Sequence, residues 1–248
     1  MRPPCSLLTC ISQAIYDSKG AHSVTKPILV KPIYKSQDLS NLRPIALQNS
    51  LAKLPSKILA TRLTDALHRN GALLHANEGF LRHKSTGNAI GTILSAFEDA
   101  VQFNKPLFGA SLDIAKAYDS IRWFTIKNGM DRINLPQEFQ DYAMGKMVNS
   151  TMEIRTRYGL TAPFVIERGV PQGCPLAPLL FIIGMDLLHA GLHKNPLRSG
   201  ADDSYRIESG LDSGASDPLL SVADKAYADD TILLSSSAPG LCNMMQWQ

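Results

Sequence analysis

The sequence A-Y-A-D-D-T-I-L-L-S-S-S, residues 226–237, combines two adjacent carboxylates with a β-prone run. Asp229 and Asp230 come directly before residues 231–234, and a cluster of Ser, Pro and Gly follows that run. This order predicts a hairpin with the aspartates at its tip. A plain turn is the alternative, because short carboxylates cap backbone donors. Two carboxylates at a hairpin tip repel each other unless a cation lies nearby, so the hairpin interpretation points to a metal site.

The triplet Ala-Asp-Asp occurs a second time, at residues 201–203, in a different setting. Its neighbours form a polar stretch rich in Gly, Ser and Asp, which is typical of a surface loop. We therefore expect Asp202 and Asp203 to be solvated loop residues. The contrast indicates that the strand context, and not the triplet itself, carries the functional signal.

The composition is that of a globular chain with a mildly basic balance. The 248 residues are 44% hydrophobic and 19% charged, which is enough to bury a core as one large domain or two small ones. The formal net charge of +3 neither requires nor excludes a nucleic-acid partner. Lys and Arg are concentrated in residues 19–62, where Asp38 is the counter-charge. This segment is either a solvated basic face or a phosphate-binding surface.

The cysteines and the apolar runs argue against several classes of protein. The four cysteines form no paired C-x-x-C pattern, so we expect neither a zinc site nor a disulfide framework, and a reducing compartment fits. No apolar run reaches the length that crosses a membrane, and the apolar stretch near the N-terminus is too short and too mixed for a signal peptide. We therefore expect an intracellular protein, of the nucleus or the cytoplasm, with no membrane partner.

Strand and helix signals are mixed without regular alternation, which favours an α+β fold. Helices are expected over residues 6–18, 50–67, 86–103, 115–132 and 176–192. Extended segments are expected over residues 26–35, 41–47 and 107–114, and residues 152–166 are expected to form two strands joined near Tyr158-Gly159. Pro55 marks either an early turn or a break in the second helix. One face of the third helix carries Ile90, Ile93, Leu94 and Phe97.

Asp113 lies near the end of the expected strand 107–114, just before a helix. Alone, it is best explained as the cap of that helix. Together with Asp229 it suggests a second arrangement, in which two carboxylates meet on adjacent antiparallel strands. Such carboxylates and the phosphates of a substrate suit magnesium, which prefers oxygen ligands. Two magnesium ions held in this way are a common device for phosphoryl transfer.

Five segments occur in an order that resembles reverse transcriptases. The segments S-L-D-I-A-K-A-Y-D-S-I (111–121), G-V-P-Q-G-C-P-L-A-P-L-L-F (169–181) and A-Y-A-D-D (226–230) resemble the three palm motifs of these enzymes. The segments L-R-P-I-A-L (42–47) and N-E-G-F-L-R-H-K-S-T-G-N-A-I (77–90) resemble their finger segments. The combination is most similar to the non-LTR, LINE-like retrotransposon branch, and it spans roughly residues 24–236.

This resemblance implies the fingers and palm of a right-hand polymerase, with a palm made of an antiparallel sheet backed by helices. An N-terminal helical extension would cover residues 1–25, the fingers residues 26–106 and the palm residues 107–248. Within the palm we expect a finger-like insertion at about 124–165 and a polar loop at about 196–220. Because the chain stops soon after the A-Y-A-D-D segment, we expect the thumb to be absent.

The resemblance also implies the chemistry of RNA-directed DNA polymerisation. Asp113 and Asp229 would ligate two Mg²⁺ ions, for which Mn²⁺ is a substitute, and Asp230 would complete the acidic cluster. The metals would activate the 3′-hydroxyl of a DNA primer and stabilise the departing pyrophosphate. Ile114 would offer its backbone at the metal and triphosphate site. The partners implied are an RNA template, a DNA primer and dNTPs, and the oligomeric state is left open.

Further residues are assigned to the nucleotide and the nucleic acid by the same resemblance. Tyr118 would exclude a ribose 2′-hydroxyl, with a core aromatic as the alternative. Gln172 and Gly173 would line the nucleotide pocket, and Arg43 would clamp the triphosphate, with a structural salt bridge as its alternative. Weaker candidates for phosphate or template contact are Lys53, Arg62, Arg82 and Lys84.

Three other functions are weighed against this interpretation. An RNA-dependent RNA polymerase is disfavoured by Tyr118 and by the Y-A-D-D segment. A group II intron-type maturase is disfavoured only by the form of the L-R-P-I-A-L and K-A-Y-D segments. A non-catalytic nucleic-acid-binding remnant of the same domain stays open, because the thumb is expected to be absent. The remnant should be indifferent to the loss of the Asp229 carboxylate.

Overall fold

The computed structural model describes residues 7–19, 28–34, 42–74, 76–148, 150–194, 203–207 and 220–246. The chain divides into two compact units, and each unit is built from two separate parts of the sequence. Unit 1 consists of Met1–Ala72 and Lys116–Gly184. Unit 2 consists of Leu73–Ala115 and Met185–Gln248.

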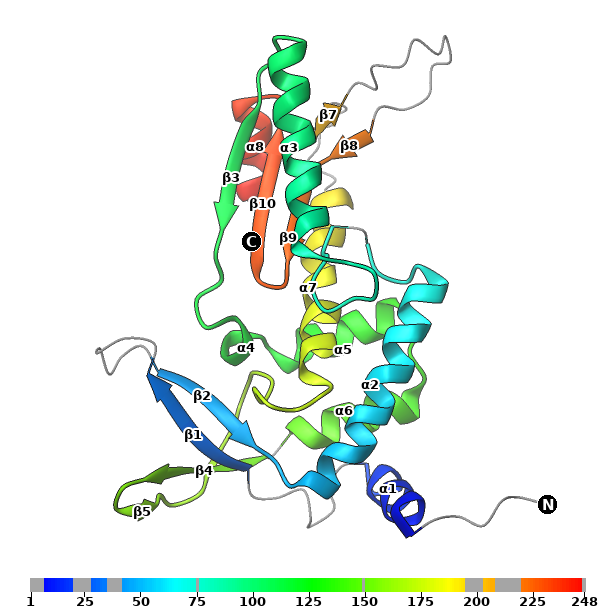
Figure 1. Ribbon diagram of the computed structural model, residues 1–248, viewed down its shortest axis with the longest axis vertical. Coiled ribbons are helices and arrows are strands. Elements are labelled where there is room, and N and C mark those ends of the chain that lie inside the picture. The colour runs from blue at the N-terminus through cyan, green and yellow to red at the C-terminus, as the bar shows by residue number, and fades with distance from the viewer. Residues whose placement is uncertain are drawn as a thin grey trace, which may run out of the picture. The chain divides into compact units, whose positions relative to one another are not determined.

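Unit 1 contains a five-stranded sheet. Its strands are β1 (Ile28–Tyr34), β2 (Leu42–Leu47), β4 (Thr151–Thr156), β5 (Gly159–Leu160) and β6 (Phe164–Val165). β1 pairs with β2 in antiparallel register and with β4 in parallel register (Figure 1). β5 and β6 each pair with β4 in antiparallel register. The extended segments predicted over 26–35 and 41–47 are therefore confirmed where the chain is described. Two strands were predicted within 152–166, and their junction near Tyr158-Gly159 is confirmed, but a third strand, β6, also pairs with β4.

The helices of unit 1 differ in their capping. They are α1 (Leu7–Asp17), α2 (Ser50–Asn70), α4 (Ala117–Ser120), α5 (Trp123–Arg132), α6 (Gln137–Met147) and the first part of α7 (Ala177–Lys194). α2 has capping residues at both ends, whereas no side chain caps the start of α4, α5 or α6. The side chain of Asn49 caps the start of α2, and Gly71 ends it with a left-handed φ of 54°. Pro55 lies buried inside α2, which continues past it, so the predicted break is wrong.

The single helix predicted over residues 115–132 is wrong, because two shorter helices, α4 and α5, replace it. The interruption has a visible cause. The carbonyl oxygens of Tyr118 and Ile121 accept hydrogen bonds from the backbone N–H groups of Val170 and Gly169, each at 2.8 Å. These carbonyls therefore accept hydrogen bonds from a neighbouring loop. In a continuous helix they would accept from the N–H groups of the following turn. The helix α6 was not predicted, since its sequence shows little amphipathic periodicity.

Unit 2 is built around a three-stranded antiparallel sheet in the order β3-β10-β9 (Figure 1). These strands are β3 (Phe108–Leu112), β10 (Asp230–Ser235) and β9 (Asp224–Tyr227), and a separate pair joins β7 (Tyr205–Ile207) to β8 (Leu220–Val222). The helices are α3 (Thr86–Gln102), α8 (Ala238–Met245) and the remainder of α7. The α+β prediction is confirmed by these sheets and helices.

Neighbouring residues of β10 point into two different cores. Leu234 packs with Ala96 and Ala100 of α3, while Leu233 packs with Leu192 of α7 and Met244 of α8. This alternation is the period of a strand that is covered on both faces. The central strand of the sheet is therefore fixed by helices on its two sides.

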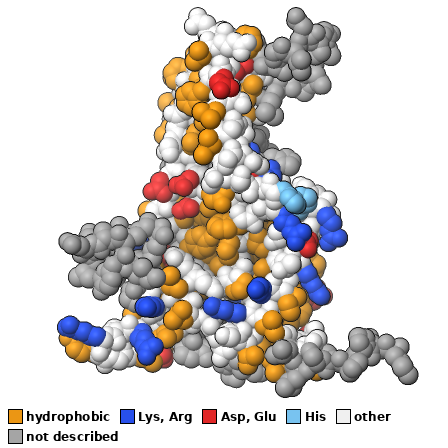
Figure 2. All heavy atoms as spheres, viewed as in Figure 1, with side chains coloured by type: hydrophobic (Ala, Val, Ile, Leu, Met, Phe, Trp, Pro, Cys, Tyr) orange, Lys and Arg blue, Asp and Glu red, His pale blue; other side chains and the backbone are white. Residues whose placement is uncertain are grey.

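The apolar face predicted for α3 is largely exposed. Ile90, Leu94 and Phe97 are each more than half exposed, and Figure 2 shows hydrophobic side chains gathered over this part of unit 2. The small residues Ala96 and Ala100 pack against the sheet instead. Among the described residues, none of the helices combines the length and the apolar character that a membrane crossing requires.

The end of β10 differs from the sequence prediction in two ways. The Ser, Pro and Gly cluster ends the strand as expected, but it also starts α8, because the Ser237 side chain accepts a hydrogen bond from the backbone N–H of Gly240. Asp203 lies outside the strands and helices, as predicted, but it is only partly exposed and its Oδ2 atom is buried. Its backbone carbonyl accepts a 2.6 Å hydrogen bond from the Ser235 hydroxyl, which needs a partner because Ser235 is fully buried. Asp202 lies outside the described residues.

A short segment before α3 extends the sheet beside β9. The backbone N–H of Ala226 donates to the Ala76 carbonyl at 2.8 Å, and the N–H of Glu78 donates to the Ala226 carbonyl at 2.9 Å. Glu78 is only 2% exposed and accepts hydrogen bonds from Lys225 at 2.7 Å and from Lys84 at 3.2 Å. Two lysines and paired backbone groups thus hold this segment against β9.

The boundaries of the two units do not coincide with the predicted boundaries of fingers and palm. Residues 73–106 belong to the unit that contains β3, β9 and β10, and residues 116–184 belong to the unit that contains β1 and β2. The assignment of fingers to 26–106 and palm to 107–248 stays a prediction. The structure describes residues 203–207 and 220 of the predicted polar loop 196–220; residues 205–207 form β7 and residue 220 begins β8.

Replacing Leu233 by Ala should lower the free energy of unfolding by about 2–5 kcal/mol, because it leaves a cavity in a dry core. Leu233 is 0% exposed, whereas Leu94 is 53% exposed and provides the matched control. Urea denaturation followed by circular dichroism measures both variants. Equal effects of Leu233→Ala and Leu94→Ala would contradict the assignment of Leu233 to the core.

Glu78 should make the stability of the fold depend on pH. Burial acts to raise the pKa of its carboxyl, but hydrogen bonds from Lys225 and Lys84 outweigh it and hold the pKa below the ordinary value of 4.5. The ionised carboxylate therefore stabilises the fold above pH 4.5, and this contribution is lost as the pH falls through the folded pKa.

Urea denaturation of the wild type and of Glu78→Gln across this range measures the effect. The difference in unfolding free energy between the two should be largest at neutral pH and should shrink as the pH falls below 4.5. Glu98→Gln, at an exposed glutamate of α3, is the control. A difference that stays constant with pH would contradict the role of the ionised Glu78.

Candidate active site

The predicted hairpin tip is confirmed. Tyr227 of β9 pairs with Asp230, the first residue of β10, and the two residues between them, Ala228 and Asp229, make the turn. Asp229 is half-buried, and the side chain of Asp230 is exposed. The adjacent carboxylates therefore sit where two antiparallel strands end, and solvent reaches them.

Asp113 lies at the same edge of the sheet. It directly follows Leu112, the last residue of β3, and Leu112 pairs with Thr231, which directly follows Asp230. Paired strands lie about 5 Å apart, so β3 and the β9–β10 turn bring their carboxylates to one end of the sheet. The alternative that Asp113 caps the next helix is wrong, because Lys116 occupies the cap position of α4.

The donor chemistry of this edge fits a divalent cation. Asp113, Asp229 and Asp230 offer only carboxylate oxygens, the ligands that Mg²⁺ and Mn²⁺ prefer. In the part of the chain that the structure describes, however, His, Cys, Asp and Glu side chains form no group of three or more that could hold a metal ion. The residues fit a metal in type and in strand position, and the metal role of each stays a prediction. Ile114, directly after Asp113, is half-buried.

The turn that carries Asp229 is held by Asn77, a residue with no role in the sequence analysis. The Asn77 side-chain amide donates to the Ala228 carbonyl at 2.9 Å and accepts from the Ala228 N–H at 3.1 Å. It also accepts from the Gly79 N–H at 2.8 Å. The signal that could have found it is its place at the start of the N-E-G-F segment, which was assigned to the fingers as a whole.

In unit 1, a glycine-rich loop joins several of the predicted nucleotide-binding residues. Gly173 has a φ of 131°, and a Cβ there would lie 2.2 Å from the Ala46 carbonyl oxygen, so only glycine lets the loop approach β2 so closely. The N–H of Ala46 donates to the Gln172 carbonyl at 2.7 Å. At its other end the loop bonds the backbone of Tyr118. Tyr118, Gln172 and Gly173 therefore belong to one local structure.

Tyr118 is held in a defined orientation by an aromatic neighbour. Its ring stacks on Phe181 with centroids 4.8 Å apart and an interplanar angle of 9°. The contact agrees with the core-aromatic alternative, but Tyr118 is only half-buried. The Gln172 side chain donates to Asp119 at 3.4 Å. Burial raises the pKa of the Asp119 carboxyl, and this hydrogen bond partly offsets the rise.

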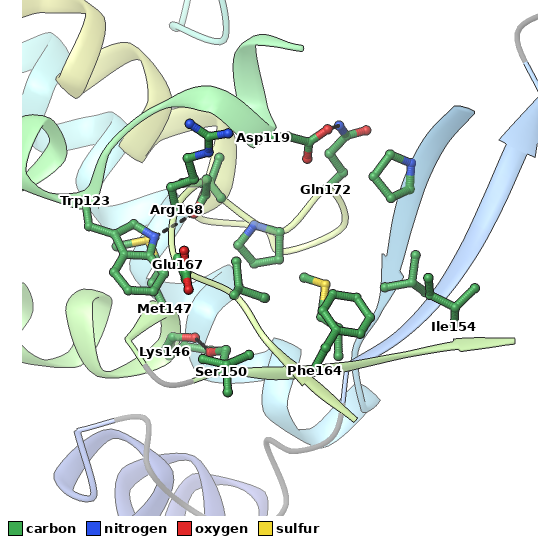
Figure 3. A pocket seen from close by; sticks show the side chains of 18 residues that line it. Asp119, Trp123, Lys146, Met147, Ser150, Ile154, Phe164, Glu167, Arg168 and Gln172 are labelled. Atoms are coloured by element: carbon green, nitrogen blue, oxygen red, sulfur yellow. Dashed lines mark hydrogen bonds between the residues drawn. The ribbon is translucent and has the colours of Figure 1, made fainter. Parts of the chain in front are cut away.

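A cavity of about 390 Å³ lies within unit 1 beside this loop (Figure 3). Trp123, Phe164 and Ile154 contribute apolar walls, and Asp119 and Gln172 lie together at its polar edge. The indole N–H of Trp123 donates to the Gly169 carbonyl at 2.8 Å and so fixes its ring against the loop. Gln172 therefore lines a hollow that is large enough for a small aromatic group.

The basic candidates are distributed over both units. Arg43 pairs through its backbone with Ile33 in the β1–β2 ladder, and its side chain lies outside the described part of the structure. Lys53 is half-buried, and Arg62 and Arg82 are exposed. Lys84 forms an ion pair with Glu78 at 3.1 Å, so its ammonium already has an acidic neighbour.

The predicted site residues fall into two sets by unit. Unit 2 contains Asp113, Ile114, Asp229 and Asp230 together with Arg82 and Lys84. Unit 1 contains Arg43, Tyr118, Gln172 and Gly173 together with Lys53 and Arg62. Within each unit the main members are joined by strand pairing or by loop hydrogen bonds.

Comparison with known proteins identifies relatives of this chain. Residues 33–246 match the family described as reverse transcriptase (RNA-dependent DNA polymerase). The chain is 31% identical over 202 residues to the Retrovirus-related Pol polyprotein from type-1 retrotransposable element R2 of Popillia japonica, covering 80% of this chain and 25% of that protein. It is 24% identical over 174 residues to the RNA-directed DNA polymerase from mobile element jockey of Drosophila funebris, covering 68% and 18%. The chain thus spans a quarter or less of the length of these relatives.

The fold has solved counterparts as well. The structure of apo telomerase from Candida tropicalis truncated from its C-terminal domain superposes with a TM-score of 0.59 at 15% identity, covering 94% of this chain and 49% of that one. This likeness concerns the fold alone. The sequence relatives from R2 and jockey confirm the resemblance to the LINE-like branch. Since the family match extends over most of the chain, the protein belongs to the reverse transcriptase (RNA-dependent DNA polymerase) family.

Proposed function

We propose that this chain is the core of an RNA-directed DNA polymerase of a non-LTR retroelement, which adds dNTPs to the 3′-hydroxyl of a DNA primer on an RNA template. The observation that supports the proposal is the pairing of Leu112 with Thr231, because Asp113 directly follows Leu112 and the Asp229–Asp230 pair directly precedes Thr231 at the same end of the β3–β10 ladder. Family membership supplies the reaction class, and the strand register supplies the carboxylates that this reaction needs.

Asp113 and Asp229 are the residues that would hold two Mg²⁺ ions, or Mn²⁺ as a substitute, and Asp230 would add negative charge next to them. When bound, such ions activate a hydroxyl nucleophile and stabilise the leaving pyrophosphate. The strand ends hold the carboxylates at a fixed separation, because the β3–β10 ladder continues up to Leu112 and Thr231. Ile114 would present its backbone to the triphosphate just after Asp113. No side chain is required as a nucleophile.

The nucleotide would be selected by the residues of unit 1. Tyr118, held by its stack on Phe181, would block a ribose 2′-hydroxyl. Gln172 and Gly173 would line the nucleotide pocket, and Arg43 would bind the triphosphate. Phosphates of the template or primer would be bound by the positive charges of Lys53, Arg62, Arg82 and Lys84. The attraction of Lys84 for a phosphate is reduced by its ion pair with Glu78.

Replacing Asp229 by Ala should lower primer extension by on the order of 100-fold or more, because a carboxylate that would hold the catalytic Mg²⁺ ions is lost. The substitution removes no packing from the core, so circular dichroism should be unchanged. Primer extension on an RNA template with dNTPs and Mg²⁺ measures the effect. The matched control is Asp131→Ala, at an exposed aspartate of α5 paired with Lys127.

Extension by Asp229→Ala at the wild-type rate would refute the catalytic role of this carboxylate. Binding of the template and primer without extension, by the wild type and the variant alike, would favour the non-catalytic nucleic-acid-binding alternative for this chain.

Replacing Tyr118 by Ala should raise the use of ribonucleotides relative to deoxyribonucleotides by about 10-fold or more, since a steric block is removed. Single-nucleotide incorporation with each rNTP and dNTP measures the ratio. Tyr158→Ala is the control, because Tyr158 is 84% exposed in the β4–β5 connection. An unchanged sugar preference in Tyr118→Ala would leave the stack on Phe181 as a purely structural contact.

A further inference from the structure

We infer that Asn77 is a positioning residue of this enzyme, which holds the Ala228–Asp229 turn in the conformation that catalysis requires. The inference rests on the proposed function, because the turn carries one of the proposed metal-binding carboxylates. Asn77 does not touch a substrate in this arrangement. It acts through the backbone of Ala228, the residue directly before Asp229.

The Asn77 amide satisfies both backbone groups of one residue. It donates to the carbonyl of Ala228 at 2.9 Å and accepts from the N–H of Ala228 at 3.1 Å. Ala228 is only 6% exposed and Asn77 only 5%, so water is a poor substitute for these bonds. An amide carries a donor and an acceptor at its end, whereas a carboxylate can only accept. The site therefore uses a property that distinguishes Asn from Asp.

The held residue has an unusual backbone. Ala228 has a φ of 59°, in the left-handed region that residues with a Cβ rarely adopt. A glycine would adopt this conformation more easily, so the chain depends on outside contacts to keep alanine there. The double hydrogen bond from Asn77 is such a contact. Since Asp229 is the next residue, the orientation of its carboxylate follows from this held peptide.

Asn77 is itself fixed to the same hairpin. Its neighbours Ala76 and Glu78 bond both backbone groups of Ala226, and Glu78 binds Lys225 of β9. A Cβ added to Gly79 would lie 2.5 Å from the Ala228 nitrogen, so the segment lies directly against the turn. The segment and the turn therefore form one local structure, in which movement of one displaces the other.

Hydrogen exchange tests the structural half of the inference without any catalytic assay. The amide of Ala228 should exchange faster in Asn77→Ala by on the order of tenfold, the effect of one lost hydrogen bond. The amides of the β3–β10 ladder should keep their protection. Asn243→Ala, at an exposed asparagine of α8, is the control and should change neither set. Unchanged exchange at Ala228 in Asn77→Ala would overturn the inference.

Primer extension tests the functional half. In Asn77→Ala we expect kcat to fall by on the order of 10- to 100-fold, because moving a catalytic group by about 1 Å lowers the reaction rate by such a factor. The KM for primer and template should change little. The Mg²⁺ concentration at half-maximal rate should rise, a readout that general destabilisation would not move. Wild-type kinetics in a variant whose Ala228 amide has lost protection would overturn the inference.

Asn77→Ser is the second variant if Asn77→Ala does not fold, because its hydroxyl keeps a hydrogen-bond donor and acceptor and places no charge against the Ala228 carbonyl. The hydroxyl is one bond shorter than the amide, so the Ala228 amide should exchange faster than in the wild type and kcat should fall. Wild-type exchange and wild-type kcat in Asn77→Ser would overturn the inference. If the wild type itself shows no extension, the proposed function fails, while the exchange data still decide whether Asn77 holds the turn.

Discussion

The antiparallel pairing of β10 with β3 is the interaction on which the candidate site depends. Its register sets Thr231 against Leu112 and so brings the carboxylates that precede and follow these residues to one end of the sheet. Leu233 and Leu234 lock this register, since they fill cores on opposite faces of the sheet. A slip by one residue would exchange the two faces and bury the wrong side chains.

Close approaches of backbone to backbone organise the rest of the candidate site. In unit 1, Gly173 lets the loop lie against the Ala46 carbonyl, and the same loop takes the carbonyl of Tyr118 as a partner. In unit 2, the segment before α3 approaches the β9–β10 turn, and Gly79 gives it room. In both units, glycine permits contacts that any side chain would prevent; the polar groups brought together are satisfied by backbone partners in unit 1 and by the Asn77 side chain in unit 2.

Much of this arrangement could be predicted from the sequence, and the failures have physical causes. The A-Y-A-D-D hairpin was predictable because a β-prone run, two carboxylates and a breaker cluster are local signals. The interruption between α4 and α5 was not, because the loop that takes the carbonyls of Tyr118 and Ile121 lies far away in the sequence. The partial burial of Asp203 has the same kind of cause, since its partner, the buried hydroxyl of Ser235, is distant in the sequence.

The sequence by itself determined the family and the α+β class and proposed the candidate carboxylates, because these depend on residue types in a fixed order. Only the tertiary structure decided how the turn before Asp229 is held. Asn77 and Ala228 are separated by most of the chain, and a hydrogen bond between such residues leaves no local pattern. This hydrogen bond forms only because the short segment around Asn77 pairs with β9. That pairing forms when the sheet and its covering helices pack together.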